Sequence, residues 1–353
     1  MQFWPAILSQ AERDQEHPEL AAAVDERASG RVRWAPQRRD PADRTGTSVS
    51  VPSMTSSRSF PHEPGLLGII GHPVRSSLSP AMQQAALRRL KLDARYQAFE
   101  IAPGQVPAVL RALPALGFWG INVTIPYKEK VVTLLDEVDA EAGAIGAVNT
   151  IVVREGRLLG YNTDAEGFRL ALEIEGRTGL PGARVLVVGA GGAARAVAFA
   201  CLTRGCRSLL IANRSVARAR SLCRALRVNF PAADVEAVTD GGPDWAGLVE
   251  AASVIVNTTP LGSGPGDPLP VPRETLRRGQ TVMDIVCRPR HTPLLIAAEA
   301  AGARTVDGLQ MLLHQGALAF RLWTRREAPL TVMRRALVAA ATSAGRRVTV
   351  LPP

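Results

Sequence analysis

The sequence predicts an α/β fold built from two domains. Short apolar segments with the pattern of β-strands alternate with helical segments over most of the chain, which is typical of mostly parallel sheets. The alternation forms two series, one on each side of an expected β-hairpin near residue 155, where two short strands flank a polar turn. We therefore expect two α/β units with a cleft between them.

The first series forms the expected N-terminal domain, residues 63–165. Its members are strands at 66–71, 96–101 and 121–125 and helices at 80–92, 106–116 and 128–138. Two further strands, 148–153 and 158–162, are joined by the sequence Arg-Glu-Gly-Arg, which suits a hairpin turn.

The second series forms the expected second domain, residues 166–307. Its strands are expected at 185–188, 208–212, 235–238, 254–257, 282–286 and 304–306, and helical segments lie between them, notably at 193–203 and 294–301. Two helical segments, 311–321 and 332–344, follow it.

Residues 1–62 differ from the rest in composition. They mix eight acidic and eight basic residues with scattered Pro, Ser and Thr and show little periodicity. We expect a mostly disordered extension, with a short helix possible at 19–28. Met54 lies just before the first strand, so a start of translation there is an alternative.

Composition excludes several classes of function. The net charge of +10 calls for a nucleic-acid partner to be considered, but the basic residues are dispersed and aromatic residues make up only 5%. No apolar run reaches the roughly 20 residues that span a bilayer, and the first 20 residues do not have the pattern of a signal peptide. The four cysteines form no CxxC pair, and no His/Cys cluster has the spacing of metal ligands. We expect a cytoplasmic protein with no metal, no nucleic-acid partner and no membrane.

A glycine-rich turn marks the start of the second domain. The segment 185–195 is an apolar strand, a turn and the start of a helix, and it matches G-x-G-x-x-G/A with Gly189, Gly191 and Ala194 in the three small positions. Small residues there allow a tight turn, close approach of the backbone to a pyrophosphate, and helix–strand packing. Free N–H groups at the helix start then face the phosphates, so we predict a Rossmann-like dinucleotide site.

The end of the next strand indicates which dinucleotide binds. An NAD site usually has an acidic residue about 20 residues after the glycines, to hold the ribose 2′-hydroxyl. Here Asn213 stands in that place and is followed by Arg214, Ser215 and Arg218. Guanidinium groups pair well with a 2′-phosphate, so we predict NADP.

Two ionisable residues are candidates for acid–base chemistry. Only three of the 42 basic residues are lysines, and one of them, Lys128, follows a strand at the expected start of a helix. Lysine can be tuned to lose its proton, whereas arginine effectively cannot; the alternative is a solvated lysine at a helix start. Asp164, in the segment Tyr-Asn-Thr-Asp, is a second candidate, with a helix N-cap as its alternative. Asn149 and Asn162 are candidate site residues or turn residues.

The motifs together resemble one family. GHPVRSSLSP, GINVTIPYK, IGAVNT, YNTDAEG, GAGGAAR, NRSVAR, NTTPLG, DIVCRPRHTPLL and GLQMLLHQGALAF occur in that order between residues 66 and 325. This order resembles shikimate dehydrogenase. The resemblance implies that the first domain is completed by residues of about 308–348 and that Lys128 and Asp164 are the catalytic pair.

The resemblance also implies the binding residues. Those for substrate are Ser77, Ser79, Asn122, Thr124, Asn149 and Gln315. Those for NADP are Gly189, Ala190, Gly191, Gly192, Ala193, Ala194, Asn213, Arg214, Ser215, Arg218, Ile285 and Gly308.

The implied activity is the reversible NADP-dependent reduction of 3-dehydroshikimate to shikimate, in the chorismate pathway to aromatic amino acids. Quinate or an aminated analogue is the alternative substrate. Ser77, Ser79 and Thr124 favour shikimate, whereas Cys287 replaces a family tyrosine that can reach the substrate. We expect a small-molecule substrate and a monomer or homodimer.

Overall fold

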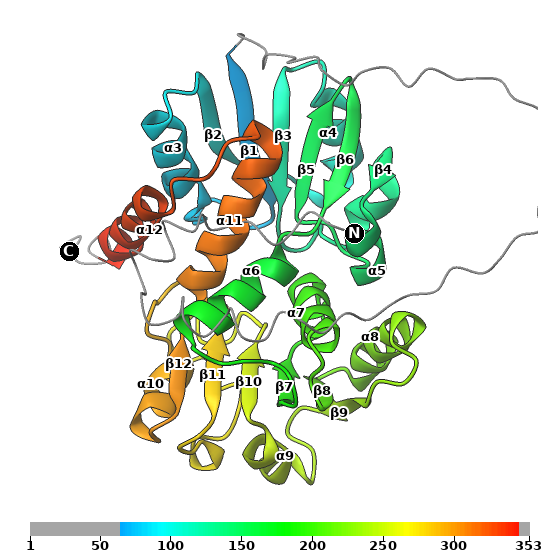
Figure 1. Cartoon of the computed structure of the whole chain (residues 1–353), viewed down its shortest axis with the longest axis vertical. Helices are drawn as coiled ribbons and strands as arrows, with labels where there is room; N and C mark the ends of the chain where they lie inside the picture. The colour runs from blue at the N-terminus through cyan, green and yellow to red at the C-terminus, as the bar shows by residue number, and fades with distance from the viewer. Residues whose placement is uncertain (1–63, 346–353) are drawn as a thin grey trace, which may run out of the picture. The chain divides into compact units, whose positions relative to one another are not determined.

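The computed structural model describes residues 64–345 (Figure 1). The expected extension at 1–62, the short helix at 19–28 and Met54 lie outside the described residues. The described part contains two six-stranded sheets, which confirms the predicted α/β fold.

The first sheet has the strand order β2-β1-β3-β5-β6-β4. Its strands are β1 (Gly65–Gly71), β2 (Ala94–Glu100), β3 (Phe118–Val123), β4 (Glu137–Val138), β5 (Thr150–Arg154) and β6 (Arg157–Tyr161). Strand β1 pairs in parallel with β2 and β3, and β5 pairs antiparallel with both β3 and β6. The β5–β6 turn has positive φ at both Glu155 (53°) and Gly156 (76°), as a two-residue type I′ hairpin turn requires.

Alternate residues of β1 face two separate cores, because side chains along a strand point to opposite faces. Leu67 and Ile69 pack with α3 (Ser79–Arg89), α11 (Gly308–Thr324) and α12 (Leu330–Gly345). Ile70 packs on the other face with α4 (Val106–Ala112). The C-terminal helices therefore belong to the core of the first sheet.

The expected helix at 128–138 is wrong. The segment instead forms a short 3₁₀ helix, η2 (Lys130–Leu134), followed by β4, which pairs in parallel with β6. Asp136 Oδ2 accepts a hydrogen bond from Leu158 N at 2.7 Å and ties the segment to the sheet. Tertiary pairing of this kind overrides local helix propensity. The next helix, α5 (Ala140–Ile145), was not expected.

The second sheet is parallel throughout and has the order β12-β11-β10-β7-β8-β9. Its strands are β7 (Arg184–Val188), β8 (Ser208–Asn213), β9 (Val235–Thr239), β10 (Val254–Asn257), β11 (Thr281–Asp284) and β12 (Arg304–Val306). Helices α7 (Gly192–Thr203), α8 (Val216–Asn229), α9 (Trp245–Ala251) and α10 (Pro293–Ala300) connect them. The strand order reverses beside β7, and parallel sheets bind ligands at such a switch point.

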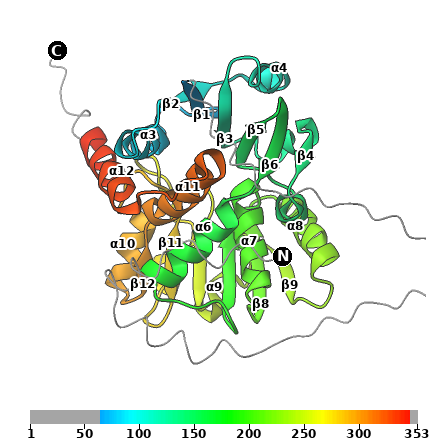
Figure 2. The ribbon, with the colours of Figure 1, turned by 45° about the horizontal axis from the view of Figure 1, so that its top comes forward.

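Helix α6 (Asp164–Leu170), which continues as a π turn over Ala171–Glu175, leads from the first sheet towards the second. It packs against both α7 and α11, while α12 lies beside α3 (Figure 2). Trp323 at the end of α11 donates its indole hydrogen to Ile151 O of β5 at 2.9 Å. These contacts bring a helix from the end of the chain next to Asp164.

Candidate active site

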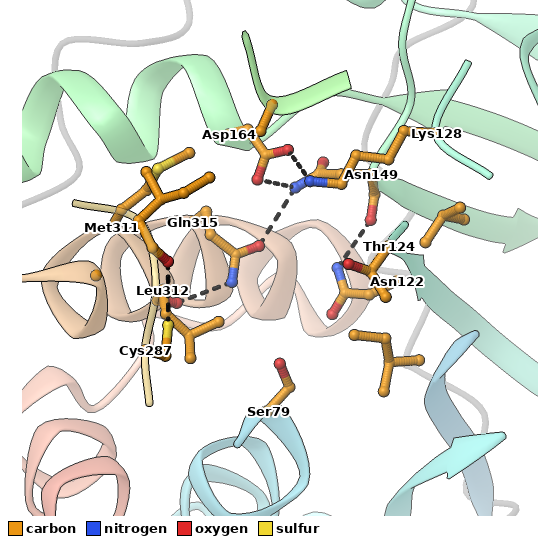
Figure 3. Close-up of a pocket in the computed structure, with 15 residues that line it drawn as sticks. Ser79, Asn122, Thr124, Lys128, Asn149, Asp164, Cys287, Met311, Leu312 and Gln315 are labelled. Atoms are coloured by element: carbon orange, nitrogen blue, oxygen red, sulfur yellow. Dashed lines mark hydrogen bonds and ion pairs between the residues drawn. The ribbon is translucent and has the colours of Figure 1, made fainter. Parts of the chain in front are cut away.

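A pocket of about 200 Å³ lies at the carboxyl ends of strands from both sheets, against α11 (Figure 3). One part of its lining comes from the first sheet and the helices packed on it. The other part comes from the second sheet and α7. The lining residues are Ile69, Ser79, Asn122, Val123, Thr124, Lys128, Asn149, Asp164, Ala193, Ile285, Cys287, Gly308, Met311, Leu312 and Gln315.

Lys128 and Asp164 form an ion pair inside this pocket. Lys128 Nζ lies 2.6 Å from Asp164 Oδ2, and the two side chains are 16% and 6% exposed. Charge-assisted hydrogen bonds of this length are among the strong ones. The pair therefore offers an amine and a carboxylate that are held together and largely shielded from water.

The backbone around Lys128 differs from the prediction. Lys128 lies in a turn ahead of η2, so it does not occupy the first turn of an α-helix. Its carbonyl accepts a hydrogen bond from Val148 N at 2.8 Å. A β-carbon on Gly192, at the start of α7, would lie 2.8 Å from Lys128 Cβ. The lysine stem thus packs directly against the helix that follows the glycine-rich turn.

Asp164 is free to face the lysine because another residue caps its helix. Asn162 Oδ1 accepts hydrogen bonds from Asp164 N at 3.0 Å and Ala165 N at 3.2 Å. The capping alternative for Asp164 is therefore wrong, since Asn162 takes that role. The Asp164 carboxylate instead accepts from Lys128 Nζ and, on its other oxygen, from Asn149 Nδ2 at 2.9 Å.

Asn149 connects three chain segments around the ion pair. Its Nδ2 also lies 2.9 Å from Thr163 Oγ1 and 3.3 Å from Gln315 Oε1, and its Oδ1 accepts from Thr163 N at 2.8 Å. Gln315 comes from α11, which is 166 residues further along the chain. The structure thus brings the predicted Asn149, Asp164 and Gln315 together.

Asn122 is held in one orientation by its neighbours. Its Nδ2 donates to Asn149 O and Thr150 Oγ1, both at 3.1 Å, and its Oδ1 accepts from Tyr96 at 2.7 Å. Burial raises the pKa of Tyr96 well above its usual value, although a hydrogen bond with Ser79 lowers it in part. The hydroxyl therefore stays protonated as a donor. The sequence reasoning missed Tyr96; a tyrosine on a buried strand, where its hydroxyl needs a partner, was the available signal.

Two predicted hydroxyl residues differ in their placement. Thr124 and Ser79 line the pocket, and Ser79 lies across it from the ion pair (Figure 3). Ser77 is not among the lining residues, and its Oγ accepts a hydrogen bond from Ser79 N at 3.3 Å. Ser77 therefore shapes the turn that presents Ser79.

The glycine-rich turn has the geometry that a dinucleotide requires. Gly189 has φ of +119°, and a β-carbon there would lie 2.3 Å from Thr258 Oγ1. Gly191 is the N-cap of α7 without a side-chain cap, and a β-carbon on it would enter open space. Backbone N–H groups at such a helix start are open to an anion. Ala194 is fully buried, as close packing of the helix on the sheet requires, so these residues fit the pyrophosphate of NADP.

The predicted 2′-phosphate residues lie at the end of β8. Arg214, Ser215 and Arg218 are exposed, and Asn213 Nδ2 donates to Ser215 O at 3.1 Å. Burial raises the pKa of Asp240, and the nearby positive charge of Arg214 lowers it in part. Both arginines are therefore exposed at the surface, and Asp240 lies close enough to Arg214 for their charges to interact.

Apolar and sulfur-containing residues complete the pocket. Ala193, Ile285 and Gly308, which were predicted to bind cofactor, line it beside Met311 and Leu312, which were not predicted. Met311 and Leu312 have the pattern of core residues in the sequence, so no sequence signal distinguishes them.

Cys287 also lines the pocket. Burial, with smaller contributions from the negative charges of Asp307 and Asp284, raises the pKa of its thiol to about 12, although the positive charge of Arg288 lowers it in part. The thiol is thus neutral, and it lies 3.5 Å from Ile285 O.

None of the helices within residues 64–345 combines the length and the hydrophobicity that a membrane span needs. Across the same residues, no group of three or more His, Cys, Asp or Glu side chains is arranged to hold a metal ion.

Family models match three stretches of the chain. The substrate-binding domain of shikimate dehydrogenase matches residues 69–151, shikimate/quinate 5-dehydrogenase matches 169–241, and the C-terminal domain of shikimate 5′-dehydrogenase matches 308–338. The shikimate dehydrogenase (NADP(+)) of Moorella thermoacetica is 48% identical over 275 residues, 77% of this chain and 92% of the relative. That of Methanopyrus kandleri is 42% identical over 81% of this chain and 99% of the relative.

Solved structures show the same fold. Shikimate 5-dehydrogenase from Thermus thermophilus, in complex with NADP(H) and shikimate, has a TM-score of 0.70 and 38% identity, over 78% of this chain and 99% of that chain. Quinate dehydrogenase from Corynebacterium glutamicum, in complex with NAD, has a TM-score of 0.72 and 34% identity over the same shares. From the identity and coverage of these relatives, we conclude that the chain belongs to the shikimate dehydrogenase family.

Proposed function

We propose that the chain is an NADP-dependent oxidoreductase that interconverts shikimate and 3-dehydroshikimate, in the chorismate pathway. The observation that carries this proposal is the ion pair of Lys128 and Asp164, which faces a pocket bordered by the glycine-rich turn of a dinucleotide site. A CH–OH group bound there would lie between an acid–base pair and a hydride carrier. The relatives that carry the same activity match over most of the chain.

The proposed chemistry divides between cofactor and protein. NADP, when bound, accepts or donates the hydride through its nicotinamide ring. The substrate oxygen must lose or gain a proton in the same event, and Lys128 is the group in the pocket that can exchange it. Asp164, 2.6 Å from Lys128 Nζ, holds the amine in place and stabilises its charged form.

We propose that five predicted polar residues of the pocket bind the substrate directly. Asn149 and Gln315 lie beside the ion pair and would hold ring hydroxyls near it. Ser79 and Thr124 would bind the far end of the substrate, together with the turn that Ser77 shapes, and Asn122 Oδ1 retains capacity to accept a hydrogen bond. The ring would thus lie across the pocket with its reacting hydroxyl at Lys128.

The cofactor would occupy the second sheet. We propose that residues 189–194 bind its pyrophosphate, that Asn213, Arg214, Ser215 and Arg218 bind the 2′-phosphate, and that Ile285 and Gly308 border the nicotinamide. The corresponding division of the chain is substrate binding by residues 63–165 with 308–348 and cofactor binding by 166–307. A cytoplasmic location, no nucleic-acid partner and a monomeric or homodimeric state are part of the same proposal.

Quinate is the second candidate substrate. The quinate dehydrogenase of Corynebacterium glutamicum has a similar fold, and one matching family model covers both activities. Cys287 at the pocket also removes a hydroxyl that the family's tyrosine would provide. The hydroxyl groups of Ser79 and Thr124 remain in the lining and favour shikimate.

The absorbance of the reduced cofactor, NADPH or NADH, formed by the purified chain tests both candidates. Shikimate and quinate are each supplied with NADP and, separately, with NAD. We expect turnover with shikimate and NADP and a lower kcat/KM with quinate. A higher kcat/KM with quinate would favour the second candidate, and absence of turnover with either acid would refute the proposal.

A further inference from the structure

The charged side chains that line the pocket already balance each other. Lys128 and Asp164 are paired, and the thiol of Cys287 is neutral because burial raises its pKa to about 12. Shikimate and quinate each bring a carboxylate. Removing a carboxylate from water is costly unless hydrogen-bond donors or a positive charge replace the water. The lining by itself supplies no unpaired positive charge for this group.

Arg288 is a cation beside the pocket that lacks a counter-ion. It directly follows the lining residue Cys287, is half-buried, and is not itself among the lining residues. Its Nη1 donates to Ser76 O at 2.9 Å and its Nη2 to Ala340 O at 3.4 Å, while its Nε is buried without a hydrogen-bond partner. Among the described residues, no carboxylate pairs with Arg288, in contrast to Arg290 two residues later, which pairs with Asp307 at 2.6 Å.

The contact with Ser76 links this charge to the segment that ends at Ser79. Ser76 directly precedes Ser77, whose Oγ accepts a hydrogen bond from Ser79 N. Ser79 lines the pocket on the side away from Lys128 and Asp164 (Figure 3). A guanidinium has five N–H donors in a fixed fork, and the two bonds to carbonyl oxygens leave donors of Arg288 unused.

We propose that Arg288 binds the carboxylate of the substrate and supplies its counter-charge, together with the Ser77–Ser79 turn. This inference rests on the proposed function only in that the substrate is a cyclic carboxylic acid. Arg288 provides a charged donor at the end of the pocket where Cys287 provides a neutral thiol. Arg288 follows β11 of the second sheet, and the Ser77–Ser79 turn, called the serine turn below, follows β1 of the first sheet. Residues that follow strands of both sheets would therefore bind the substrate.

Variants of Arg288 and a neutral substrate analogue test the proposal. The dissociation constants of shikimate and of its isosteric carboxamide are measured by calorimetry for the wild type, R288Q, R288K and the control R290Q. R290Q removes one positive charge from the same segment without touching the serine turn. Calorimetry does not depend on turnover, and the wild-type NADP-linked assay separately tests the proposed function. Should the wild type bind quinate in place of shikimate, quinate and its carboxamide serve as the probes.

We expect R288Q to weaken binding of the carboxylate by about 10- to 100-fold, the range for a lost hydrogen bond to a charged group. Binding of the carboxamide should change by less than about threefold, because the analogue carries no charge to be balanced. R288K should restore part of the affinity, and R290Q should leave it unchanged. An equal loss for carboxylate and carboxamide in R288Q would show that Arg288 only supports the turn and would overturn the proposal, as would unchanged affinity for both.

Discussion

The carboxylate of Asp164 serves two donors at once, Lys128 Nζ on one oxygen and Asn149 Nδ2 on the other. In Asp164→Asn, one of these oxygens becomes an amide that cannot accept, and the charge that stabilises the ammonium is lost. We expect kcat for shikimate oxidation to fall by about 10²-fold or more, as for loss of an acid–base partner. Steady-state kinetics with saturating NADP measures the change.

Asp139→Asn is the matched control for this substitution. Asp139 is the N-cap of α5, and asparagine caps a helix about as well as aspartate. The kcat of Asp139→Asn should therefore stay within about twofold of the wild-type value, because the helix cap is retained. If Asp164→Asn behaved like Asp139→Asn, the carboxylate would have no part in the reaction.

Single residues differ in how far the sequence could predict them. Lys128 could be identified because lysine is rare in this chain, although its expected helical setting was wrong. Ser77 is expected to contact substrate, and in the structure its Oγ accepts a hydrogen bond from Ser79 N, a contact that the sequence pattern does not indicate. Met311 and Leu312 could not be identified, because an apolar residue that lines a pocket has the same sequence pattern as one in the core. Only the packing of α11 against the pocket distinguishes them.

At the scale of elements, the end of β8 should determine the preference for NADP. In Asn213→Asp combined with Arg214→Gln, an acidic group replaces a neutral one and one guanidinium is lost. We expect a wild-type preference for NADP over NAD of about 10²-fold in kcat/KM, since each hydrogen bond to a charged group contributes about 1.5–3 kcal/mol and exposure reduces the sum. The double variant should shrink or reverse this preference. Equal use of NADP and NAD by the wild type would show that these arginines do not reach the 2′-phosphate.

Glu175 joins the π turn after α6 to the two C-terminal helices. Its carboxylate lies 2.7 Å from Arg334 Nη2 of α12 and 3.8 Å from His314 Nε2 of α11. Burial raises the pKa of Glu175, but the neighbouring His314 and Arg334 outweigh burial and lower it from 4.5 to about 2. A carboxyl group whose pKa is lower in the folded state stabilises the fold above its unfolded pKa and loses that effect as the pH falls.

Glu175→Gln should therefore destabilise the fold in a pH-dependent manner. We expect its melting temperature to lie below that of the wild type at pH 7, with the difference shrinking as the pH falls from about 4.5 towards 2. Glu327→Gln removes an exposed carboxylate that pairs with Arg321 at 3.4 Å, and such pairs contribute little. A difference for Glu175→Gln that stayed constant with pH would mean that packing and not charge accounts for it.

Elements were predictable where local pattern and burial agree. The strands of the second sheet lie within two residues of the expected bounds, because a fully buried parallel strand is a short apolar run bounded by turn residues. The prediction of a helix at 128–138 failed because the helical pattern of this segment competes with the pairing of β4 to β6. That pairing depends on residues about 20 positions later in the chain. A helix start near Asp164 was one of the alternatives, but the bounds of α6 were not predicted, because its cap, Asn162, and its π continuation have no distinct periodic pattern.

At the scale of the whole molecule, every residue assigned to catalysis or binding lies between Ser77 and Gln315, and the matching family models begin at residue 69. We therefore predict that a chain lacking residues 1–53 keeps its melting temperature within about 2 °C and its kcat within about twofold, because it keeps every described core residue and every assigned site residue. Thermal unfolding and steady-state kinetics of the shortened chain measure both quantities. A large loss of either would show that residues 1–53 contribute to the enzyme.

The site also combines residues that follow strands of both sheets. Lys128, which follows β3 of the first sheet, packs against Gly192, the first residue of α7, which follows β7 of the second sheet. The most direct test of the proposed chemistry is the turnover of Lys128→Ala with shikimate and NADP, measured together with the dissociation constant of shikimate. We predict that kcat falls by about 10²–10⁴-fold, the usual contribution of a positioned acid–base group, while the dissociation constant changes far less. Retention of more than about a tenth of the wild-type kcat would contradict the assignment of Lys128 as the group that exchanges the proton.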